Sequence, residues 1–344
     1  MRRCIQLAKN GLGTTYPNPM VGSVIVYNDR IIGEGWHYKA GLPHAEVNAI
    51  NSVTNLELLK EATIFISLEP CSHFGKTPPC SDLIINSGIK KVVVGSSDPN
   101  PKVAGKGIQK LIDAGCTVTS GVLADECRDL NKRFFKYHIN KRPYLILKWA
   151  QTENGFMAPK IETRGEVKAP VWITNPQSRQ LVHKLRSDEQ SILVGTHTVL
   201  TDNPSLTTRD WQGNNPIRIV IDRGLKIPNE AAVFDGTTST IVITEKVESH
   251  NRSCCTHEII DFSNDVPQQI CNVLFQSNIQ SVLIEGGAKT LQSFIDSNLW
   301  DEAYIFTGAQ IFNDGVKAPT LKGKMISENN IKGDVLRHYK NTTI

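Results

Sequence analysis

The feature that most constrains this 344-residue sequence is a histidine and two cysteines that lie far apart along the chain. His44 is followed two residues later by Glu46, and Cys71 and Cys80 each follow a proline. Imidazole nitrogen and thiolate sulfur are ligands that zinc prefers, and three protein ligands leave one position of a tetrahedral ion open. If these residues bind one ion, the fold must bring two helix starts and the end of a strand together.

The pattern favours a catalytic zinc site over a structural one. His-x-Glu followed by Pro-Cys and a second Cys is the signature of the zinc deaminases, in which the Glu carries protons and does not bind metal. A structural site would need a fourth ligand, and the only nearby candidate, His73, lies awkwardly two residues after Cys71. We therefore predict the metal ligands His44, Cys71 and Cys80, with Glu46 as the catalytic residue. Eight residues rather than two separate the cysteines, which departs from the generic signature.

Composition excludes several classes of protein. The net charge of +4 is spread along the chain without a long basic block, so we expect no nucleic-acid partner. No apolar run approaches the roughly 20 residues of a membrane span, and the first ten residues are typical of an amphipathic helix and not of a signal peptide. We expect a cytoplasmic protein with reduced thiols. The cysteines outside the metal set are predicted to be packing or surface residues: Cys4, Cys116, Cys127, Cys254, Cys255 and Cys271.

Helix and strand patterns alternate in the first half, which predicts an α/β sandwich. The expected strands are 21–27, 30–36, 62–68, 91–95 and 117–120, and the first two form a hairpin around Asn28 and Asp29. The expected helices are 1–10, 44–53, 80–87, 105–114 and 124–138. The pattern restarts after the run 140–143, which we take as the domain boundary.

The second half is predicted to be α/β as well. Its expected strands are 144–149, 191–195, 217–222, 240–244, 281–285 and 303–307, with helices at 176–187, 267–276 and 289–297. Near-continuous apolar strands separated by helices favour a mostly parallel sheet that is covered on both faces. No GxGxxG follows a strand. Glu285-Gly286-Gly287 does lie between a strand and a helix, where backbone N–H groups favour a phosphate, although a tight turn is an equal interpretation.

The segment from Glu69 to Cys80 carries a family resemblance. It reads EPCSHFGKTPPC, and together with His44-Ala45-Glu46 it closely resembles the bifunctional riboflavin-biosynthesis deaminase–reductase family. The similarity extends over nearly the whole chain, through runs that begin at Asn18, Asp98, Val103, Lys148, Trp172, Leu185, Ile192, Thr198, Asp202 and Glu285. The chain departs from the family at Asn154, where an Asp is common, and at 169–171.

The resemblance implies both the fold and two reactions. It implies a cytidine-deaminase-like α/β/α sandwich at 1–142 and a dihydrofolate-reductase-like α/β domain at 143–344. The first domain would use one zinc ion to deaminate 2,5-diamino-6-ribosylamino-4(3H)-pyrimidinone 5′-phosphate, and the second would use NADPH to reduce the ribosyl group to ribityl. The expected partner is thus a small phosphorylated pyrimidine, with no membrane partner, and we expect a homo-oligomer.

The resemblance also implies the contact residues. The deaminase substrate would be held by Asn18, His37, Lys76, Asp98 and Asn100. NADPH would be held by Ala150, Trp172, Thr198, Asp202, Arg223 and the run Gly287, Ala288, Lys289, Thr290, Leu291, Gln292 and Ser293. The reductase substrate would be held by Lys148, Thr174, Arg186, Leu206, Arg209 and Glu285. Guanidinium groups match phosphate oxygens, so Arg186 and Arg209 would form the phosphate clamp.

Two interpretations of other classes stay open at this point. The first is a zinc deaminase of another nucleotide or of a nucleic-acid base, with a degenerate second domain. The second is a catalytically idle binding or scaffold protein. The missing basic aromatic surface weighs against the first, and the intact metal set with Glu46 weighs against the second.

Overall fold

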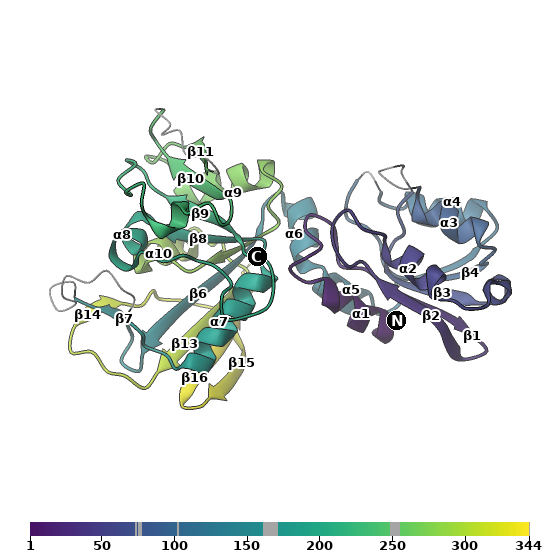
Figure 1. Cartoon of the computed structure of the whole chain (residues 1–344), viewed down its shortest axis with the longest axis horizontal. Helices are drawn as coiled ribbons and strands as arrows, with labels where there is room; N and C mark the ends of the chain where they lie inside the picture. The colour runs from purple at the N-terminus through teal and green to yellow at the C-terminus, as the bar shows by residue number, and fades with distance from the viewer. Residues whose placement is uncertain (73, 75–77, 102, 161–170, 248–254, 344) are drawn as a thin grey trace. The chain divides into compact units, whose positions relative to one another are not determined.

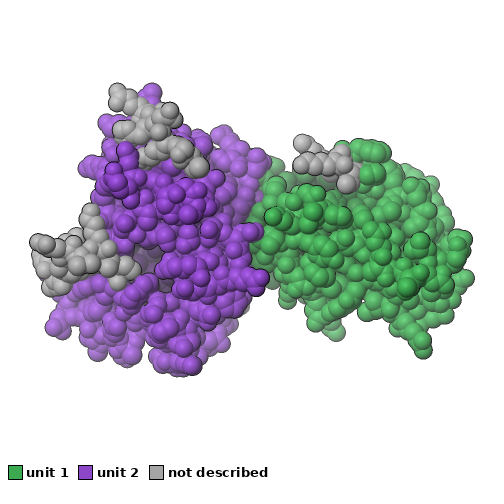
Figure 2. Space-filling model, in the orientation of Figure 1, with its two compact units in different colours: residues 1–141 green, residues 142–344 purple. Residues whose placement is uncertain are grey.

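The computed structural model describes residues 1–72, 74, 78–101, 103–160, 171–247 and 255–343. The chain divides into two compact units, unit 1 (Met1–Lys141) and unit 2 (Arg142–Ile344), which Figure 2 colours separately. The division lies one residue before the expected domain boundary. Arg142 belongs to unit 2 because its guanidinium donates two hydrogen bonds, of 2.7 and 3.0 Å, to the buried carboxylate of Asp301. No helix in the described ranges combines the length and the apolar character that crossing a membrane requires.

Unit 1 is built on a five-stranded sheet in the order β2-β1-β3-β4-β5 (Figure 1). Asn28 and Asp29 both have positive φ, as a type I′ turn requires, and they join β1 and β2 in the expected hairpin. β1 also pairs antiparallel with β3, whereas β3, β4 and β5 are parallel. The strands are β1 (Gly22–Tyr27), β2 (Arg30–Trp36), β3 (Thr63–Leu68), β4 (Lys91–Ser96) and β5 (Thr117–Ser120).

Helices cover both faces of this sheet. Ile64 and Ile66 of β3 pack in one core with residues of α2 (Ala45–Asn51), α3 (Cys80–Asn86) and α4 (Lys106–Asp113). Phe65, which points to the opposite face, packs with Cys4 and Leu7 of α1 (Arg2–Ala8). The expected α/β/α layering is therefore confirmed. Short 3₁₀ helices lie at η1 (Lys9–Gly11) and η2 (Leu56–Lys60).

The prediction of a single helix at 124–138 is wrong. The segment forms two helices, α5 (Ala124–Leu130) and α6 (Lys132–Asn140), which meet at Asn131. The buried Asn131 side chain accepts a hydrogen bond of 2.8 Å from the Met20 N–H and donates one of 2.9 Å to the Met20 carbonyl. Asn131 thereby holds the loop before β1, and the helix is interrupted at Asn131.

Unit 2 contains a nine-stranded sheet in the order β11-β10-β9-β8-β12-β6-β13-β16-β15 and a two-stranded sheet of β14 and β7. The sheet from β11 to β13 is parallel, as expected. Its strands are β6 (Tyr144–Thr152), β8 (Ser191–Gly195), β9 (Ile217–Ile221), β10 (Thr240–Thr244), β11 (Cys255–Ile259), β12 (Ser281–Ile284), β13 (Glu302–Gly308), β15 (Lys324–Ile331) and β16 (Asp334–Lys340), and the small sheet has β7 (Phe156–Pro159) and β14 (Gly315–Lys317).

Alternate residues of β6 build a core on each face of the large sheet. Leu147 packs with α9 (Val266–Gln276) and α10 (Ala288–Asp296), and Ile146 packs with α7 (Pro176–Asp188) and α8 (Thr196–Asp202). A 3₁₀ helix, η4 (Ala232–Phe234), packs in the second core. The expected strand set omits β7, β11 and β14, and also β15 and β16, which pair antiparallel beyond β13. Most of β15 is polar and exposed, so it carries no alternation of apolar residues.

The carboxylate of Glu69 holds the loop that connects β4 to α4. Glu69 follows the last residue of β3 and is 4% exposed. Its Oε2 accepts the N–H groups of Asp98 at 3.2 Å and Gly105 at 3.0 Å. Its Oε1 accepts those of Gly107 at 2.9 Å and Ile108 at 3.3 Å. Four backbone donors thus satisfy one buried carboxylate, and the loop is fixed next to Cys71.

We predict that Glu69→Gln loosens this loop. The side-chain NH₂ group would face two backbone donors, and each unsatisfied buried donor costs about 1–3 kcal/mol. Hydrogen exchange of the Asp98, Gly105 and Gly107 amides should accelerate at least about tenfold, as native-state exchange measured by NMR would show. Glu57→Gln is the matched control, because Glu57 is exposed and bonds to Lys60. Unchanged exchange in the Glu69 variant would contradict the assigned role.

Candidate metal centre and the cavity of unit 2

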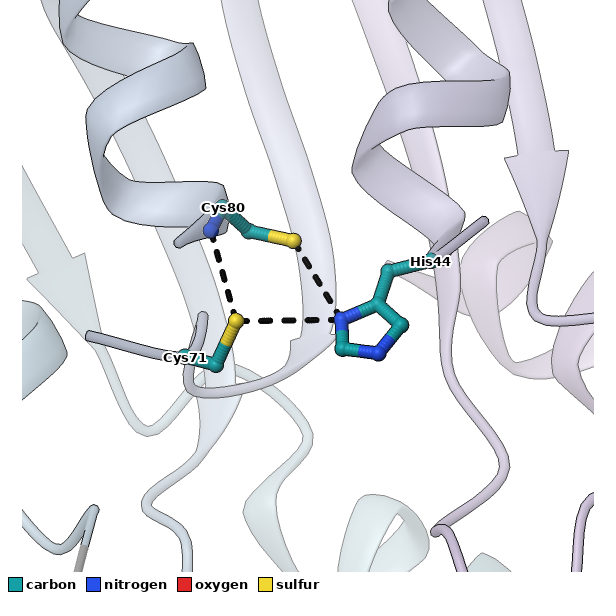
Figure 3. Close-up of side chains that lie close together, drawn as sticks. All are labelled: His44, Cys71 and Cys80. Carbon is teal, nitrogen blue, oxygen red and sulfur yellow. Dashed lines mark hydrogen bonds between the residues drawn. The ribbon is translucent and has the colours of Figure 1, made fainter. Parts of the chain in front are cut away.

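Three ligand atoms from separate elements of unit 1 lie together (Figure 3). His44 is the N-cap residue of α2, Cys71 lies three residues beyond the end of β3, and Cys80 is the first residue of α3. The Nδ1 atom of His44 is 3.7 Å from the Cys71 sulfur and 3.4 Å from the Cys80 sulfur. All three ligand atoms lie within 4.8 Å of one another. The residues expected to bind metal are thus brought together.

The environment of Cys71 favours the thiolate form that binds metal, whereas the hydrogen bond to Cys71 and burial raise the pKa of Cys80. The Cys80 N–H, at the start of α3, donates to the Cys71 sulfur at 3.3 Å. The pKa of Cys71 is lowered to about 4, chiefly by a hydrogen bond from the Cys80 thiol, and the contact with His44 lowers it further although burial opposes this. One thiolate, a second thiol and an imidazole are a donor set that fits zinc.

Glu46 lies in the first turn of α2, two residues after His44, and is 3% exposed. Burial raises the pKa of its carboxyl group, and the neighbouring His44 opposes that effect. A buried carboxyl group beside a metal site can hold a proton and release it, which is the property that proton transfer requires.

His37 and Asn18 form a hydrogen-bonded chain beside His44. The Nδ1 atom of His37 lies 3.1 Å from the Pro43 carbonyl, which can only accept, so Nδ1 carries the proton. The Nε2 atom then accepts a hydrogen bond of 3.0 Å from the Asn18 amide. Burial lowers the pKa of His37, which agrees with a neutral ring. Its ring centre lies 5.2 Å from that of His44.

The other expected deaminase contacts lie partly on the loop that Glu69 holds. Asp98 is 8% exposed, and burial raises its pKa to about 6. Its Oδ1 accepts the Asn100 N–H at 2.7 Å, so the two residues form one turn. Lys76 and His73, like Cys254, lie outside the described residues. The buried Cys4, Cys116, Cys127 and Cys271 pack inside the protein, and Cys255 is half-buried, as expected.

Unit 2 contains a cavity of about 380 Å³. Ten of the residues expected to contact NADPH or the second substrate line it. They are Lys148, Ala150, Trp172, Thr174, Arg186, Thr198, Asp202, Leu206, Arg209 and Glu285. They come from β6, α7, α8 and the loops at 171–175, 203–209 and 285, so segments far apart in the sequence share one cavity.

A buried charge cluster lies at this cavity. The Glu285 carboxylate accepts hydrogen bonds from Arg186 at 2.8 and 2.9 Å, and the Lys148 ammonium lies 3.5 Å away. Burial raises the pKa of Glu285, but Arg186 and Lys148 together outweigh it and lower the pKa to about 2. Burial lowers the pKa of Lys148, and Glu285 opposes this effect. Glu285 is therefore ionised while two cations share its charge.

The remaining expected NADPH contacts do not line this cavity. Arg223 pairs with Glu245 at 2.8 Å and is largely exposed. The run from Gly287 to Ser293 forms the start of α10, where the Leu291 side chain is fully buried in the core and its N–H bonds to the Gly287 carbonyl. Leu291 thus has neither an exposed side chain nor a free N–H for a nucleotide, which corrects that expectation. The run also contains Ala288, Lys289, Thr290 and Gln292, and none of these residues lines the cavity.

Glycines allow the turn between β8 and α8 to meet the turn between β12 and α10. A Cβ on Gly286 would lie 2.5 Å from the Val194 Cα, and one on Gly195 would lie 2.7 Å from the Thr290 hydroxyl. Gly287 has a φ of 46° and is the N-cap residue of α10. The Glu285-Gly286-Gly287 run is therefore a close approach of two backbones and not only a turn.

Sequence reasoning missed Arg179 and His183, which also line the cavity. The signal was available, because Arg179, His183 and Arg186 have the i, i+4, i+7 spacing of one helical face. His183 is buried, and its Nε2 lies 3.2 Å from the Asp210 carboxylate. Burial lowers the pKa of His183, and Arg186 and Arg209 lower it further.

Comparison with family models divides the chain in the same way. Residues 1–96 match the cytidine and deoxycytidylate deaminase zinc-binding region. Residues 143–333 match the RibD C-terminal domain. One match contains the metal ligands and the other contains the cavity.

Full-length relatives carry both parts. The riboflavin biosynthesis protein RibD of Aquifex aeolicus is 40% identical over 333 residues, covering 96% of this chain and 91% of the relative. RibD of Escherichia coli is 34% identical, covering 98% and 95%. The crystal structure of a diaminohydroxyphosphoribosylaminopyrimidine deaminase/5-amino-6-(5-phosphoribosylamino)uracil reductase from Thermotoga maritima matches with a TM-score of 0.89 and 39% identity, covering 99% and 97%. Acinetobacter baumannii RibD matches with a TM-score of 0.88 and 31% identity, covering 99% and 98%. This chain therefore belongs to the RibD family, the bifunctional deaminase–reductases of riboflavin biosynthesis.

Proposed function

We propose that unit 1 deaminates 2,5-diamino-6-ribosylamino-4(3H)-pyrimidinone 5′-phosphate. Unit 2 then uses NADPH to reduce the ribosyl group of the deaminated product to ribityl. The observation that carries the proposal is the cluster of His44, Cys71 and Cys80, with the buried Glu46 two residues after His44. The similarity to the Thermotoga maritima protein, which is a deaminase and reductase of such phosphoribosylamino pyrimidines, supports it. The cytoplasmic location and the homo-oligomeric state remain predictions.

His44, Cys71 and Cys80 would hold one zinc ion, and their nitrogen and two sulfur atoms are the donors such an ion requires. With three protein ligands, zinc supplies an activated water as a nucleophile near neutral pH. The Cys80 N–H keeps the Cys71 sulfur oriented.

Glu46 would move the protons of the first reaction. Its carboxylate takes one proton from the nucleophile and delivers it to a ring nitrogen, and it then takes the remaining proton of the added hydroxyl group and passes it to the leaving amine, which departs as ammonia. Burial raises its pKa, which makes the protonated form accessible between these two transfers. Asn18 is oriented by the neutral His37, and Asp98 and Asn100 lie on the loop held by Glu69. These residues, with Lys76, would bind the substrate around the nucleophile.

The second reaction requires a hydride at C1′ and a proton at the sugar oxygen that C1′ releases. NADPH supplies the hydride when bound. The Lys148 ammonium lies in the cavity with its pKa lowered by burial, so it can donate the proton. Glu285, held by two hydrogen bonds from Arg186, keeps the ammonium in place. Thr174, Leu206 and Arg209 line the same cavity and would complete the substrate site.

The nucleotide would extend from the cavity to the start of α10. Trp172, Thr198, Asp202 and Ala150 line the cavity itself. A Cβ on Gly287 would lie 3.4 Å from the Thr198 hydroxyl, so the two proposed contact regions adjoin. Backbone N–H groups at a helix start favour phosphate oxygens. Arg223 lies just beyond the carboxyl end of β9 and would contact an outer part of the nucleotide.

Glu46→Gln tests the proton transfer. The variant should retain one zinc ion, because Glu46 is not a ligand, and ammonia release should fall by about 10²–10⁴-fold or more because an amide carries no proton. Metal content is measured by atomic absorption, and NADPH-dependent reduction of the deaminated intermediate should be unchanged. Glu61→Gln, an exposed carboxylate in the same unit, is the control. Ammonia release near the parental rate would remove Glu46 from the mechanism.

Glu285→Gln tests the cluster in unit 2. The variant leaves Lys148 and Arg186 without their shared carboxylate, so kcat for reduction should fall by about 100-fold or more, as expected when a buried charge loses its partner. Ammonia release by unit 1 should be unaffected. Glu328→Gln is the control, because Glu328 pairs with Arg337 on exposed strands. Circular dichroism must first show that unit 2 remains folded, and normal reduction by the folded variant would refute the assignment.

Removal of zinc tests whether the two activities are separable. After treatment with a chelator, ammonia release should disappear and should return on addition of zinc. Oxidation of NADPH with the deaminated intermediate should continue, because hydride transfer from a nicotinamide needs no metal. Metal binding can contribute folding free energy, so circular dichroism serves as the control. Loss of reduction in a folded, zinc-free sample would show that the sites are coupled.

A further inference from the structure

One loop of unit 2 supplies a large part of the cavity wall. This cavity loop comprises residues 203–209 and follows α8. The members that line the cavity are Asn203, Pro204, Ser205, Leu206 and Arg209. Leu206 has a φ of 57°, a left-handed conformation that brings the Cβ of a leucine too close to the following carbonyl oxygen. Such a residue persists only where the surrounding structure holds it, so the cavity loop needs supports outside itself.

Arg218, the second residue of β9, is such a support. Its side chain is fully buried, and its Nε atom donates a hydrogen bond of 2.9 Å to the Ser205 carbonyl. Its Nη1 atom donates to the Val233 carbonyl at 3.1 Å and to one Asp235 carboxylate oxygen at 2.7 Å. Its Nη2 atom donates to the other Asp235 oxygen at 3.3 Å and to the Thr237 hydroxyl at 2.9 Å. These five bonds use all five N–H donors of the guanidinium group.

The ion pair with Asp235 fixes the orientation of this guanidinium group. The side chain of Asp235 is 36% exposed, whereas that of Arg218 is not exposed at all, so the carboxylate lies at the solvent end of the pair. Hydrogen bonds from Arg218 lower the pKa of Asp235 to about 2, and the carboxylate is therefore ionised at neutral pH. A planar guanidinium group held by both oxygens of one carboxylate has a single orientation, and here its Nε–H is aimed at Ser205.

Ser205 transmits this support to the side of the loop that faces the cavity. Its hydroxyl accepts a hydrogen bond of 3.2 Å from the Nη1 atom of Arg209, which lines the cavity. A second support comes from the outer segment (residues 232–237), where the Ala232 N–H donates to the Asn203 side-chain oxygen at 2.8 Å. The outer segment therefore braces the cavity loop at its first residue directly and near its middle through the buried guanidinium group.

We infer that Arg218 is a positioning residue for reduction and acts through the Ser205 carbonyl. It holds the cavity loop in the shape that presents Leu206 and Arg209 to the reductase substrate. The inference rests on the proposed function, which assigns those two residues to that substrate. Arg218 is not among the described residues that line the cavity, so its effect is transmitted and not made by contact. The proposed nucleotide contacts lie on other segments, so loss of this support should weaken binding of the substrate and not of NADPH.

Arg218→Lys tests this role, because an ammonium group keeps the charge but lacks the rigid fork that joins Ser205 to Asp235. KM for the deaminated intermediate should rise at least about tenfold, while kcat and KM for NADPH each stay within about threefold of the parental values. A substitution that only destabilised the fold would instead lower the active fraction, and hence the apparent kcat, at an unchanged KM. The split between KM and kcat therefore separates positioning from stability.

Arg142→Lys is the matched control. Arg142 forms a comparable buried pair in the same unit, with bonds of 2.7 and 3.0 Å to Asp301, and neither residue is among the described ones that line the cavity. This variant should lower the melting temperature and leave both KM values unchanged. If circular dichroism shows that Arg218→Lys does not fold, Asp235→Asn replaces it, because Asp235 is partly exposed and its amide keeps one acceptor. KM for the intermediate should then rise by about threefold or more, as expected for one weakened hydrogen bond.

Hydrogen exchange measured by NMR provides a readout that needs no substrate. The Thr208 N–H donates to the Asn215 side chain at 2.9 Å, and this bond lies near the end of the cavity loop. In Arg218→Lys, the Thr208 amide should exchange at least about tenfold faster and accelerate more than the amides of β12, whereas Arg142→Lys should show no such difference.

Two results would overturn the inference. One is an unchanged KM for the intermediate in the folded variant, and the other is an equal rise in KM in Arg142→Lys. If the parental protein does not reduce the intermediate, the proposed function fails. The exchange of Thr208 then decides separately whether Arg218 holds the cavity loop, because faster exchange supports that role and unchanged exchange refutes it.

Discussion

Burying a carboxylate is costly unless hydrogen-bond donors satisfy it, and each unit places a group satisfied in this way beside its candidate site. In unit 1, four backbone N–H groups satisfy Glu69, whose chain neighbours lead directly to Cys71. In unit 2, side-chain cations satisfy Glu285. The difference suits the two tasks. Backbone donors fix a loop, whereas side-chain cations keep positive charge next to a cavity.

Much of unit 1 could be predicted from sequence because its signals are local. The positive φ values of Asn28 and Asp29 follow from a two-residue hairpin turn, and the prolines before Cys71 and Cys80 mark the corners that present both thiols. Asn131 shows where local reasoning fails. Its neighbours all favour helix, and the break comes from a partner 111 residues away in the sequence, which no local pattern contains.

Unit 2 was harder to predict, because its site is assembled from the ends of several elements. The parallel strands other than β11 were evident from their apolar runs, but the edge strands β11 and β15 had no such pattern. The pairing of Arg186 with Glu285 joins residues 99 positions apart, so the sequence could suggest that both contact substrate but not that they bind each other. Asn154 stands where the family commonly has Asp, and its amide donates to the Phe312 carbonyl at 2.7 Å, a bond that a carboxylate could not make.

The glycines near the start of α10 couple two stretches of chain that are remote in sequence. A side chain at Gly286 would need the backbone at Val194 to move, and one at Gly195 would meet Thr290. These two turns therefore cannot change independently. A library that replaces either glycine while leaving the other turn fixed will consist largely of strained members. Redesign of either turn consequently requires that both turns be varied together, with the chain path at Gly286 retained.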